Sequence, residues 1–221
     1  MARIVVTESV TLDGVLQGPG RPDEDTRGGF RHGGWATPYP DQVMMAAVAE
    51  GMAATGALLL GRRTYQDLRR SWAERTDGNP FTERLNNTRK YVASATLAEP
   101  LPWQNSTLLT GDPVRAVERL KKELEHDIAV LGSGELVRAL AGAGLVDRFV
   151  LSVHPLVLGS GRRLFPEDGP LTRLRLVDSV LTTTGVLIAT YGPAPEATPE
   201  ATPEATPEPA HATAMMEGAG R

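Results

Sequence analysis

The apolar run at residues 58–60 ends in Gly61, and Arg62, Arg63 and Thr64 follow without an intervening turn segment. This pattern predicts a buried strand whose carboxyl end leads directly into a helix. In open α/β sheets, ligands bind at that end of the strands. The first turn of a helix offers free N–H groups and a positive dipole end, and guanidinium groups bind phosphate bidentately. The junction therefore favours a phosphate-bearing ligand, although a plain strand–turn–helix junction with solvated arginines has the same sequence pattern.

Strand-like and helix-like segments alternate along most of the chain, which predicts an α/β fold with right-handed crossovers. After Gly144 the helical patterns cease and three strand-like segments follow, so we expect the sheet to end in antiparallel strands. The prediction is a single three-layer domain with a mostly parallel central sheet of about eight strands. The expected strands cover residues 4–10, 56–60, 89–94, 106–109, 128–132, 146–153, 173–180 and 185–191, and the expected helices cover 41–54, 62–71, 80–88, 113–126 and 135–142.

Two segments do not fit this alternation. Residues 13–40 are rich in glycine, proline and charge, which predicts a long loop, and loops of this length are usually functional or disordered. From Pro195 the chain repeats Pro-Glu-Ala-Thr three times, and proline at every fourth residue excludes a helix interior. We therefore expect a folded domain over residues 1–192 and a disordered acidic tail over 193–221.

The composition argues against several classes of function. The net charge is −4, but residues 193–221 hold five glutamates and one arginine, so the rest of the chain carries 22 acidic and 22 basic residues. A neutral domain gives no support to nucleic-acid binding, which needs a basic face. The chain has no cysteine, and its four histidines lack metal-ligand spacing, so we expect no disulfide and no metal. Without a membrane-spanning apolar stretch or a recognisable signal peptide, a cytoplasmic protein with no membrane partner is expected.

A second junction of the first kind lies at residues 131–134 (Leu-Gly-Ser-Gly), between an expected strand and an expected helix. Because the carboxyl ends of parallel strands open on the same edge of a sheet, two such junctions predict a ligand-binding edge more strongly than either alone. A third expected strand ends at Ser94. Its hydroxyl could bind a phosphate beside the two arginines, or it could cap a turn.

Five short motifs, in their order along the chain, resemble the dihydrofolate reductase-like superfamily. The nearer likeness is to the reductase domain of bacterial riboflavin biosynthesis, the C-terminal domain of the deaminase-reductase, and to its stand-alone relatives. Together the motifs span nearly all of residues 3–192. They are Ser-Val-Thr-Leu-Asp-Gly at 9–14, Leu-Gly-Arg-Arg-Thr-Tyr at 60–65, Lys-Tyr-Val-Ala-Ser at 90–94, Leu-Gly-Ser-Gly at 131–134 and His-Pro-Leu-Val-Leu-Gly-Ser-Gly at 154–161.

The resemblance implies a fold that binds NADPH and a small-molecule substrate, and it also implies a homodimer. By this likeness, residues 12–14 lie near the nicotinamide and residues 61–64 hold the adenosine phosphates. Ser94 would lie near the 2′-phosphate, and residues 132–135 would approach the pyrophosphate. The cofactor-binding residues so implied are Leu12, Gly14, Gly61, Arg62, Arg63, Thr64, Ser94, Gly132, Ser133, Gly134 and Glu135.

The predicted function is an NADPH-dependent reductase of a small heterocyclic substrate, similar to a pterin or pyrimidine, or of a carbonyl compound, with the hydride supplied by the cofactor. Dihydrofolate reductases carry a carboxylate in the helix before the 58–60 strand, whereas residues 43–46 are Val-Met-Met-Ala, so reduction of folate itself is not expected. The candidate proton donors are Asp13 and Asp41, which flank the long loop; Asp41 also suits an N-cap. The alternative function is a non-catalytic NADPH- or pterin-binding protein of the same fold.

Overall fold

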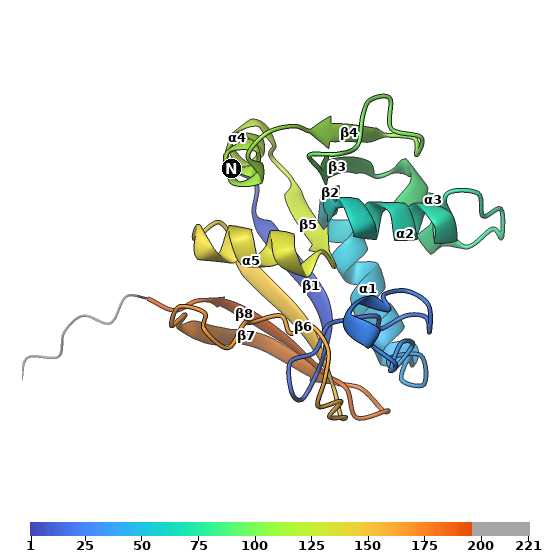
Figure 1. Ribbon diagram of the computed structural model, residues 1–221, viewed down its shortest axis with the longest axis vertical. Helices are drawn as coiled ribbons and strands as arrows, with labels where there is room; N and C mark the ends of the chain where they lie inside the picture. Colours follow the sequence, from blue (N-terminus) through green and yellow to red (C-terminus); the bar gives the residue numbers. More distant parts are fainter. Residues whose placement is uncertain (196–221) are drawn as a thin grey trace, which may run out of the picture.

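Eight strands form one sheet in a computed structural model that describes residues 1–195 of the chain (Figure 1). The strand order is β4-β3-β2-β5-β1-β6-β8-β7, and every pair from β4 to β6 is parallel. This confirms the predicted mostly parallel sheet. The strands are β1 (Ile4–Thr11), β2 (Thr55–Gly61), β3 (Arg89–Ala93), β4 (Ser106–Leu109), β5 (Asp127–Leu131), β6 (Arg148–His154), β7 (Leu174–Leu181) and β8 (Leu187–Pro193).

Five α-helices cover the two faces of the sheet, as the alternating pattern predicts. Residues of α1, α2 and α3 pack into one apolar core with β2 and β3, and residues of α4 and α5 pack into a second core with β1, β5 and β6. The sheet therefore has a helical layer on each side. The helices are α1 (Gln42–Ala54), α2 (Arg62–Trp72), α3 (Pro80–Asn87), α4 (Pro113–Glu123) and α5 (Gly134–Gly142).

Local sequence signals place three of the helix starts. Asp41 and Asp112 each lie at an N-cap and accept a hydrogen bond from a backbone N–H three residues later. Asn79 caps α3 in a similar way, and proline occupies the first position of both α3 and α4. Side-chain caps of this kind satisfy N–H groups that the helix itself leaves free, and proline lacks an N–H to satisfy.

The end of the sheet is antiparallel, as expected from the absence of helical patterns after Gly144. Strand β8 pairs antiparallel with both β6 and β7. It continues to Pro193, one residue beyond the domain boundary expected at 192, because Pro193 still pairs with Leu174. The remainder of the expected tail, from residue 196 on, lies outside the described residues.

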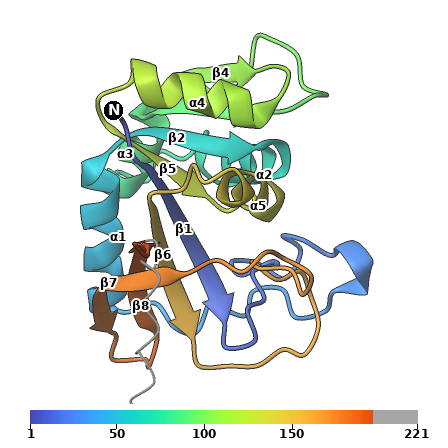
Figure 2. The ribbon, with the colours of Figure 1, turned by 90° about the vertical axis from the view of Figure 1, so that its left-hand side faces the viewer.

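The long loop after β1 lies at the carboxyl edge of the sheet. Figure 2 shows β1 leading directly into this loop, which holds the short 3-10 helix η1 (Arg27–Gly29). Val15, Phe30 and Trp35 form a small buried cluster of their own, and Val15 bridges to Arg163 in the loop before β7. Two loops distant in sequence thus meet at the edge where the parallel strands end. Among residues 1–195, no helix is both long and apolar enough to cross a membrane.

Candidate cofactor-binding site

The two glycine junctions meet at the carboxyl edge of β2 and β5. The Ser133 hydroxyl accepts a hydrogen bond from the Gly61 N–H at 2.7 Å and donates one to the Thr64 hydroxyl at 2.9 Å. The fit is close, because a Cβ at Gly61 would lie 3.0 Å from the Ser133 oxygen and one at Gly132 would lie 3.2 Å from Thr64. The structure therefore brings residues 61–64 and 132–134 together into one surface.

The turn before α5 has an unusual backbone that leaves the helix start open. Ser133 adopts the left-handed conformation with φ of 69°, and Gly132 before it has φ of 58°. Non-glycine residues rarely adopt this conformation, and such strain concentrates at ligand sites. Ser133 occupies the N-cap position, but its hydroxyl is used by the neighbouring junction and does not cap α5. The first N–H groups of α5 thus remain available to an anion.

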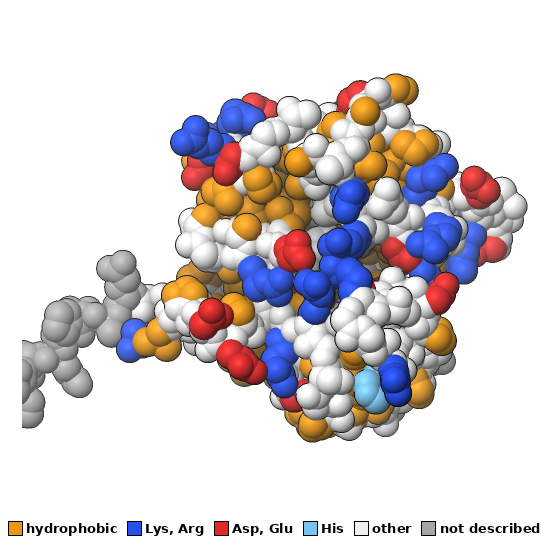
Figure 3. All heavy atoms as spheres, viewed as in Figure 1, with side chains coloured by type: hydrophobic (Ala, Val, Ile, Leu, Met, Phe, Trp, Pro, Cys, Tyr) orange, Lys and Arg blue, Asp and Glu red, His pale blue; other side chains and the backbone are white. Residues whose placement is uncertain are grey.

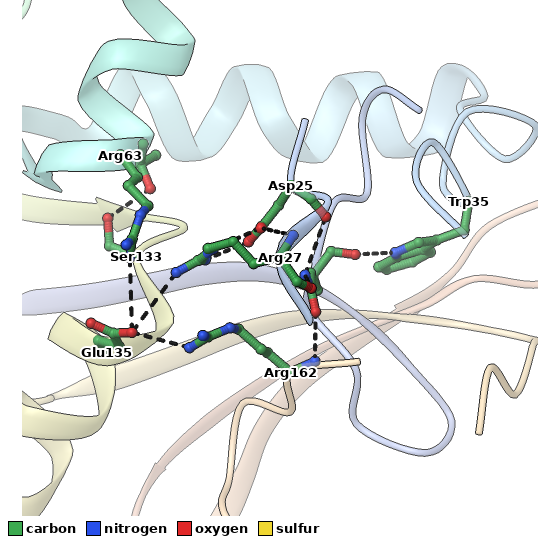
Figure 4. A network of polar contacts seen from close by, with 9 residues as sticks. Asp25, Arg27, Trp35, Arg63, Ser133, Glu135 and Arg162 are labelled. Carbon is green, nitrogen blue, oxygen red and sulfur yellow. Dashed lines mark hydrogen bonds and ion pairs between the residues drawn. The ribbon is translucent and has the colours of Figure 1, made fainter. Parts of the chain in front are cut away.

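Three arginines surround a single carboxylate beside this helix start. Arg162 donates a hydrogen bond to Glu135 at 3.1 Å, and guanidinium nitrogens of Arg27 and Arg63 lie 3.9 and 4.0 Å from the same oxygen (Figure 4). Figure 3 shows basic side chains gathered around an acidic one in the middle of this face. Arg27 also pairs with Asp25, so the three guanidinium groups share two carboxylates and one positive charge is left over. Because these side chains are partly exposed, an incoming phosphate could exchange for Glu135 as their partner.

Arg27 and Arg162 were not predicted as site residues, and Gln17 explains their position. The buried Gln17 side chain donates hydrogen bonds to the carbonyl groups of Asp25 and Arg27 at 3.1 and 2.9 Å. Its amide oxygen accepts the Arg162 N–H at 3.0 Å. One side chain therefore fixes both loops beside α5. The sequence signal for the placement of Arg27 and Arg162 is Gln17 itself, and a single glutamine in a loop is not a specific signal.

Arg62 lies apart from that cluster and reaches toward the end of β3. It donates a hydrogen bond to the Thr96 hydroxyl at 2.8 Å. The Ser94 hydroxyl accepts the N–H groups of Thr96 and Leu97 at 3.1 and 3.0 Å, which is the turn-capping alternative. Arg62 and Ser94 thus form a second polar position at the same edge. The resemblance implies that Arg62 holds the adenosine phosphates and that Ser94 lies near the 2′-phosphate, and both roles stay predictions.

The end of β1 holds the residues expected near the nicotinamide. Leu12 is 65% exposed, and Gly14 has φ of 76° in the turn that follows. The Asp13 carboxylate accepts hydrogen bonds from the Thr11 hydroxyl and from the N–H groups of Leu158 and Gly159, at 2.6, 3.2 and 2.8 Å. Burial raises the pKa of Asp13, but these hydrogen bonds outweigh it and leave the pKa below its ordinary value.

Asp41, the other candidate proton donor, is engaged at the start of α1. One carboxylate oxygen accepts the Met44 N–H at 2.8 Å, and the other accepts the N–H and hydroxyl of Thr183 at 2.6 Å each. The hydrogen bond from the Thr183 side chain, followed by that from Met44, lowers the pKa of Asp41. Both candidate acids are thus held as carboxylates by structural contacts. These contacts favour the cap alternative for Asp41, and the structure does not support proton delivery by either residue.

A third acidic residue, Glu8 in β1, has a raised pKa, whereas the pKa values of Asp13 and Asp41 are lowered. It is 6% exposed, and its Oε1 has no hydrogen-bond partner among residues 1–195. Burial raises its pKa to about 8, with a further contribution from Glu24. The sequence pattern did not identify Glu8 as a site residue, since a single carboxylate within an apolar strand carries no motif.

A hollow of about 740 Å³ lies at the opposite, amino edge of the sheet. It lies between the starts of β2, β3 and β4 and is lined by Thr55, Arg84, Arg89, Trp103 and His126, among others. None of the predicted site residues lines it, so we place the candidate site at the two junctions, where the strand ends and helix starts can bind an anion.

Comparison with known proteins identifies the family of the chain and supports its fold class. The chain is 30% identical over 198 residues to the Bacillus subtilis (strain 168) "Uncharacterized protein YyaP", covering 86% of this chain and 94% of that protein. A putative riboflavin biosynthesis protein from Shewanella sp. PV-4 has a similar structure, with a TM-score of 0.67 at 21% identity, covering 88% of this chain and all of the other. Dihydrofolate reductase from Enterococcus faecalis, solved in complex with NADP(H) and RAB-propyl, gives a TM-score of 0.55 at 13% identity, covering 86% of this chain and 96% of the other. The family model described as the RibD C-terminal domain matches residues 2–188, and the chain belongs to that family.

Proposed function

We propose that the protein is an NADPH-dependent reductase that transfers hydride to a small pterin-like or pyrimidine-like heterocycle or to a carbonyl compound. The observation that carries the proposal is the junction surface: an uncapped helix start beside Ser133, with the guanidinium groups of Arg27, Arg63 and Arg162 gathered around Glu135. An open helix start with surplus cations suits a pyrophosphate, and the additional position at Arg62 suits one further phosphate.

The residues of this chain supply binding and orientation. Arg63 and Arg162 would hold the pyrophosphate against the first turn of α5, and Arg62 with Ser94 and Thr96 would hold the 2′-phosphate. Gln17 keeps the two loops in place, which pre-organises Arg27 and Arg162 and limits the entropy lost on binding. When bound, NADPH supplies the hydride, and the protein contributes position and electrostatics. The family and the shared fold with a dihydrofolate reductase solved with NADP(H) support this assignment.

Cofactor titration tests the binding half of the proposal and can separate the two phosphate positions. We expect NADPH to bind about ten- to a hundredfold more tightly than NADH, the value of one charge-assisted contact. Arg62→Ala should lower the affinity for NADPH and leave the affinity for NADH unchanged. Arg63→Ala and Arg162→Ala should each lower the affinity for both cofactors. Arg70→Ala is the matched control, since Arg70 is an exposed arginine of the same helix α2 that pairs with Asp67. Equal affinities for the two cofactors, or no loss in any of the three variants, would contradict this arrangement.

Turnover distinguishes the reductase from a non-catalytic binding protein, the second candidate. The engagement of Asp13 and Asp41 in structural contacts favours the binding protein, because neither carboxylate is free to deliver a proton. Pterins, folates and ribitylamino-pyrimidines should be screened by the loss of NADPH absorbance. A reductase consumes NADPH with one of these substrates. A protein that binds NADPH and one of these compounds without consuming NADPH is the binding protein instead.

A further inference from the structure

Glu8 occupies the centre of the carboxyl edge, directly beside the α5 junction. Side chains of β1 alternate between the two faces, and Ile4, Val6 and Val10 pack into the core with α4 and α5, so Glu8 lies on that same face. Thr7 pairs with Leu131 of β5, which places Glu8 at the level of Gly132, where the junction turn begins. The carboxyl group is thus beneath the turn that leaves the helix start open.

The surroundings of Glu8 offer it no counter-ion. Among the described residues, burial and the carboxylate of Glu24 are the causes that raise its pKa, and both disfavour the charged form. Glu24 itself accepts the N–H groups of Gly20 and Arg21 in the long loop. The other charged side chains around this edge have partners of their own: Arg21 pairs with Asp67, Arg27 with Asp25, Arg138 with the Arg163 carbonyl, and Arg63 and Arg162 with Glu135.

An unpartnered carboxyl group buried under an open helix start is a costly arrangement unless a ligand uses it. We propose that the neutral carboxyl group of Glu8 is part of the cofactor cleft and that NADPH binds the form of the protein in which Glu8 is protonated. This inference rests on the proposed function, because it takes the pyrophosphate to lie at the start of α5. An ionised Glu8 would place a negative charge without a counter-ion beneath the negatively charged pyrophosphate. The protonated acid can instead donate a hydrogen bond to it.

Linkage gives the sign and size of the effect. With the Glu8 pKa at about 8 in the free protein, about nine-tenths of the molecules are protonated at pH 7 and about one-tenth at pH 9. NADPH affinity should therefore be about tenfold weaker at pH 9 than at pH 7. The cofactor does not titrate in this range, since the second pKa of a phosphate monoester is about 6. By reciprocity, NADPH binding must raise the Glu8 pKa, so the protein takes up protons when it binds.

The test is NADPH titration from pH 7 to pH 9.5 on the full chain and on Glu8→Gln, which mimics the neutral acid. The wild type should lose about tenfold in affinity between pH 7 and pH 9, and Glu8→Gln should stay within twofold. Glu24→Gln should begin its loss at lower pH, because removing a neighbouring negative charge lowers the Glu8 pKa. Glu167→Gln, an exposed carboxylate 3.2 Å from Arg163, is the control that should follow the wild type.

The variant comparison is necessary because buried Lys90 also has a pKa lowered to about 8 by burial and titrates in the same range. Calorimetry in two buffers of different ionisation enthalpy provides a readout that needs no variant: at pH 8 the wild type should take up about half a proton per NADPH bound. If NADPH binds at pH 7 but its affinity is flat to pH 9 and no proton is taken up, the inference is overturned while the proposed function stands. If Glu8→Gln keeps the full pH dependence, Glu8 is not its source and the inference is likewise overturned. If NADPH does not bind at pH 7, the proposed function fails, and this inference fails with it.

Discussion

Replacing Glu8 with glutamine should change how the stability of the domain depends on pH. The carboxyl group is 6% exposed and its pKa is raised from 4.5 to about 8, first by burial and second by Glu24. Between these two values the unfolded chain has released the proton and the folded chain has not. The free energy of unfolding therefore falls as pH rises through this window and levels off above pH 8.

The size of the effect follows from the shift. At about 1.4 kcal/mol per pH unit, a pKa rise from 4.5 to about 8 amounts to roughly 5 kcal/mol once Glu8 is ionised in both the unfolded and the folded state. Relative to Glu8→Gln, the wild type should lose about 2.5 kcal/mol between pH 5 and pH 7 and about 4 kcal/mol between pH 5 and pH 9. Any constant offset between acid and amide cancels in this comparison, as does the titration of Lys90, which both proteins share.

Urea denaturation at pH 5, 7 and 9 measures this difference, with fluorescence of the tryptophans as the signal. Experiments without cofactor keep the measurement independent of the binding proposal. A difference between the two proteins that stays constant within about 0.5 kcal/mol from pH 5 to pH 9 would refute the reasoning, since Glu8 would then ionise alike in the folded and unfolded chains.

Four further outcomes can be checked by simple measurements. Gly132→Ala should lose about 1–2 kcal/mol of stability in urea denaturation, because φ is 58° there. Gly134→Ala should lose less than about 1 kcal/mol, since its Cβ meets only the flexible ends of Leu16 at 3.0 Å and Arg138 at 3.7 Å; equal losses would contradict this. Asp41→Asn should keep turnover and lose up to about 1 kcal/mol of stability, because one amide oxygen cannot replace both carboxylate acceptors, and Asp41→Ala should lose about 1–2 kcal/mol as an N-cap variant; loss of turnover in an Asp41→Asn protein that stays folded would make Asp41 a proton donor. Deletion of residues 196–221 should leave the melting temperature and NADPH affinity unchanged, because the repeat has few apolar side chains to bury, and a drop in either would show that it packs on the domain. Light scattering should give a dimer, since edge strand β7 exposes leucine and valine side chains that a second copy could cover; a monomer at micromolar concentration would contradict this.

Much of the fold follows from local signals in the sequence. The N-caps at Asp41 and Asp112, the glycines at 61 and 132 and the change of pattern after Gly144 set most element boundaries within a few residues. The differences lie at element ends: α4 stops at Glu123 where the pattern allowed a helix to 126, and β6 begins at Arg148 rather than at 146. Such ends depend on tertiary contacts, which the pattern of a single segment does not contain.

The part of the candidate site formed by the ends of parallel strands could be predicted from the sequence, whereas the part formed by contacts between loops could not. Because parallel strands end at a common edge, the junctions at 61–64 and 132–134 could be expected to meet, and Ser133 connects them. Arg27 and Arg162 reach the same place only because Gln17 binds both of their loops. That contact joins positions 145 residues apart, and no local pattern specifies it.

The acidic residues in loops differ from the one in a strand in how the backbone affects their pKa. Asp13 and Asp41 draw attention in the sequence because they flank a loop, but loops and helix starts are also where backbone N–H groups lack partners. Threonine hydroxyl groups and those N–H groups bind both carboxylates and lower their pKa. Glu8 lies in a central strand, whose N–H groups are already paired with β5 and β6, so no backbone donor stabilises its charge. A carboxyl group that can keep a proton near neutral pH is therefore more readily found inside this sheet than at its loops, and only the folded structure shows that Glu8 meets that condition.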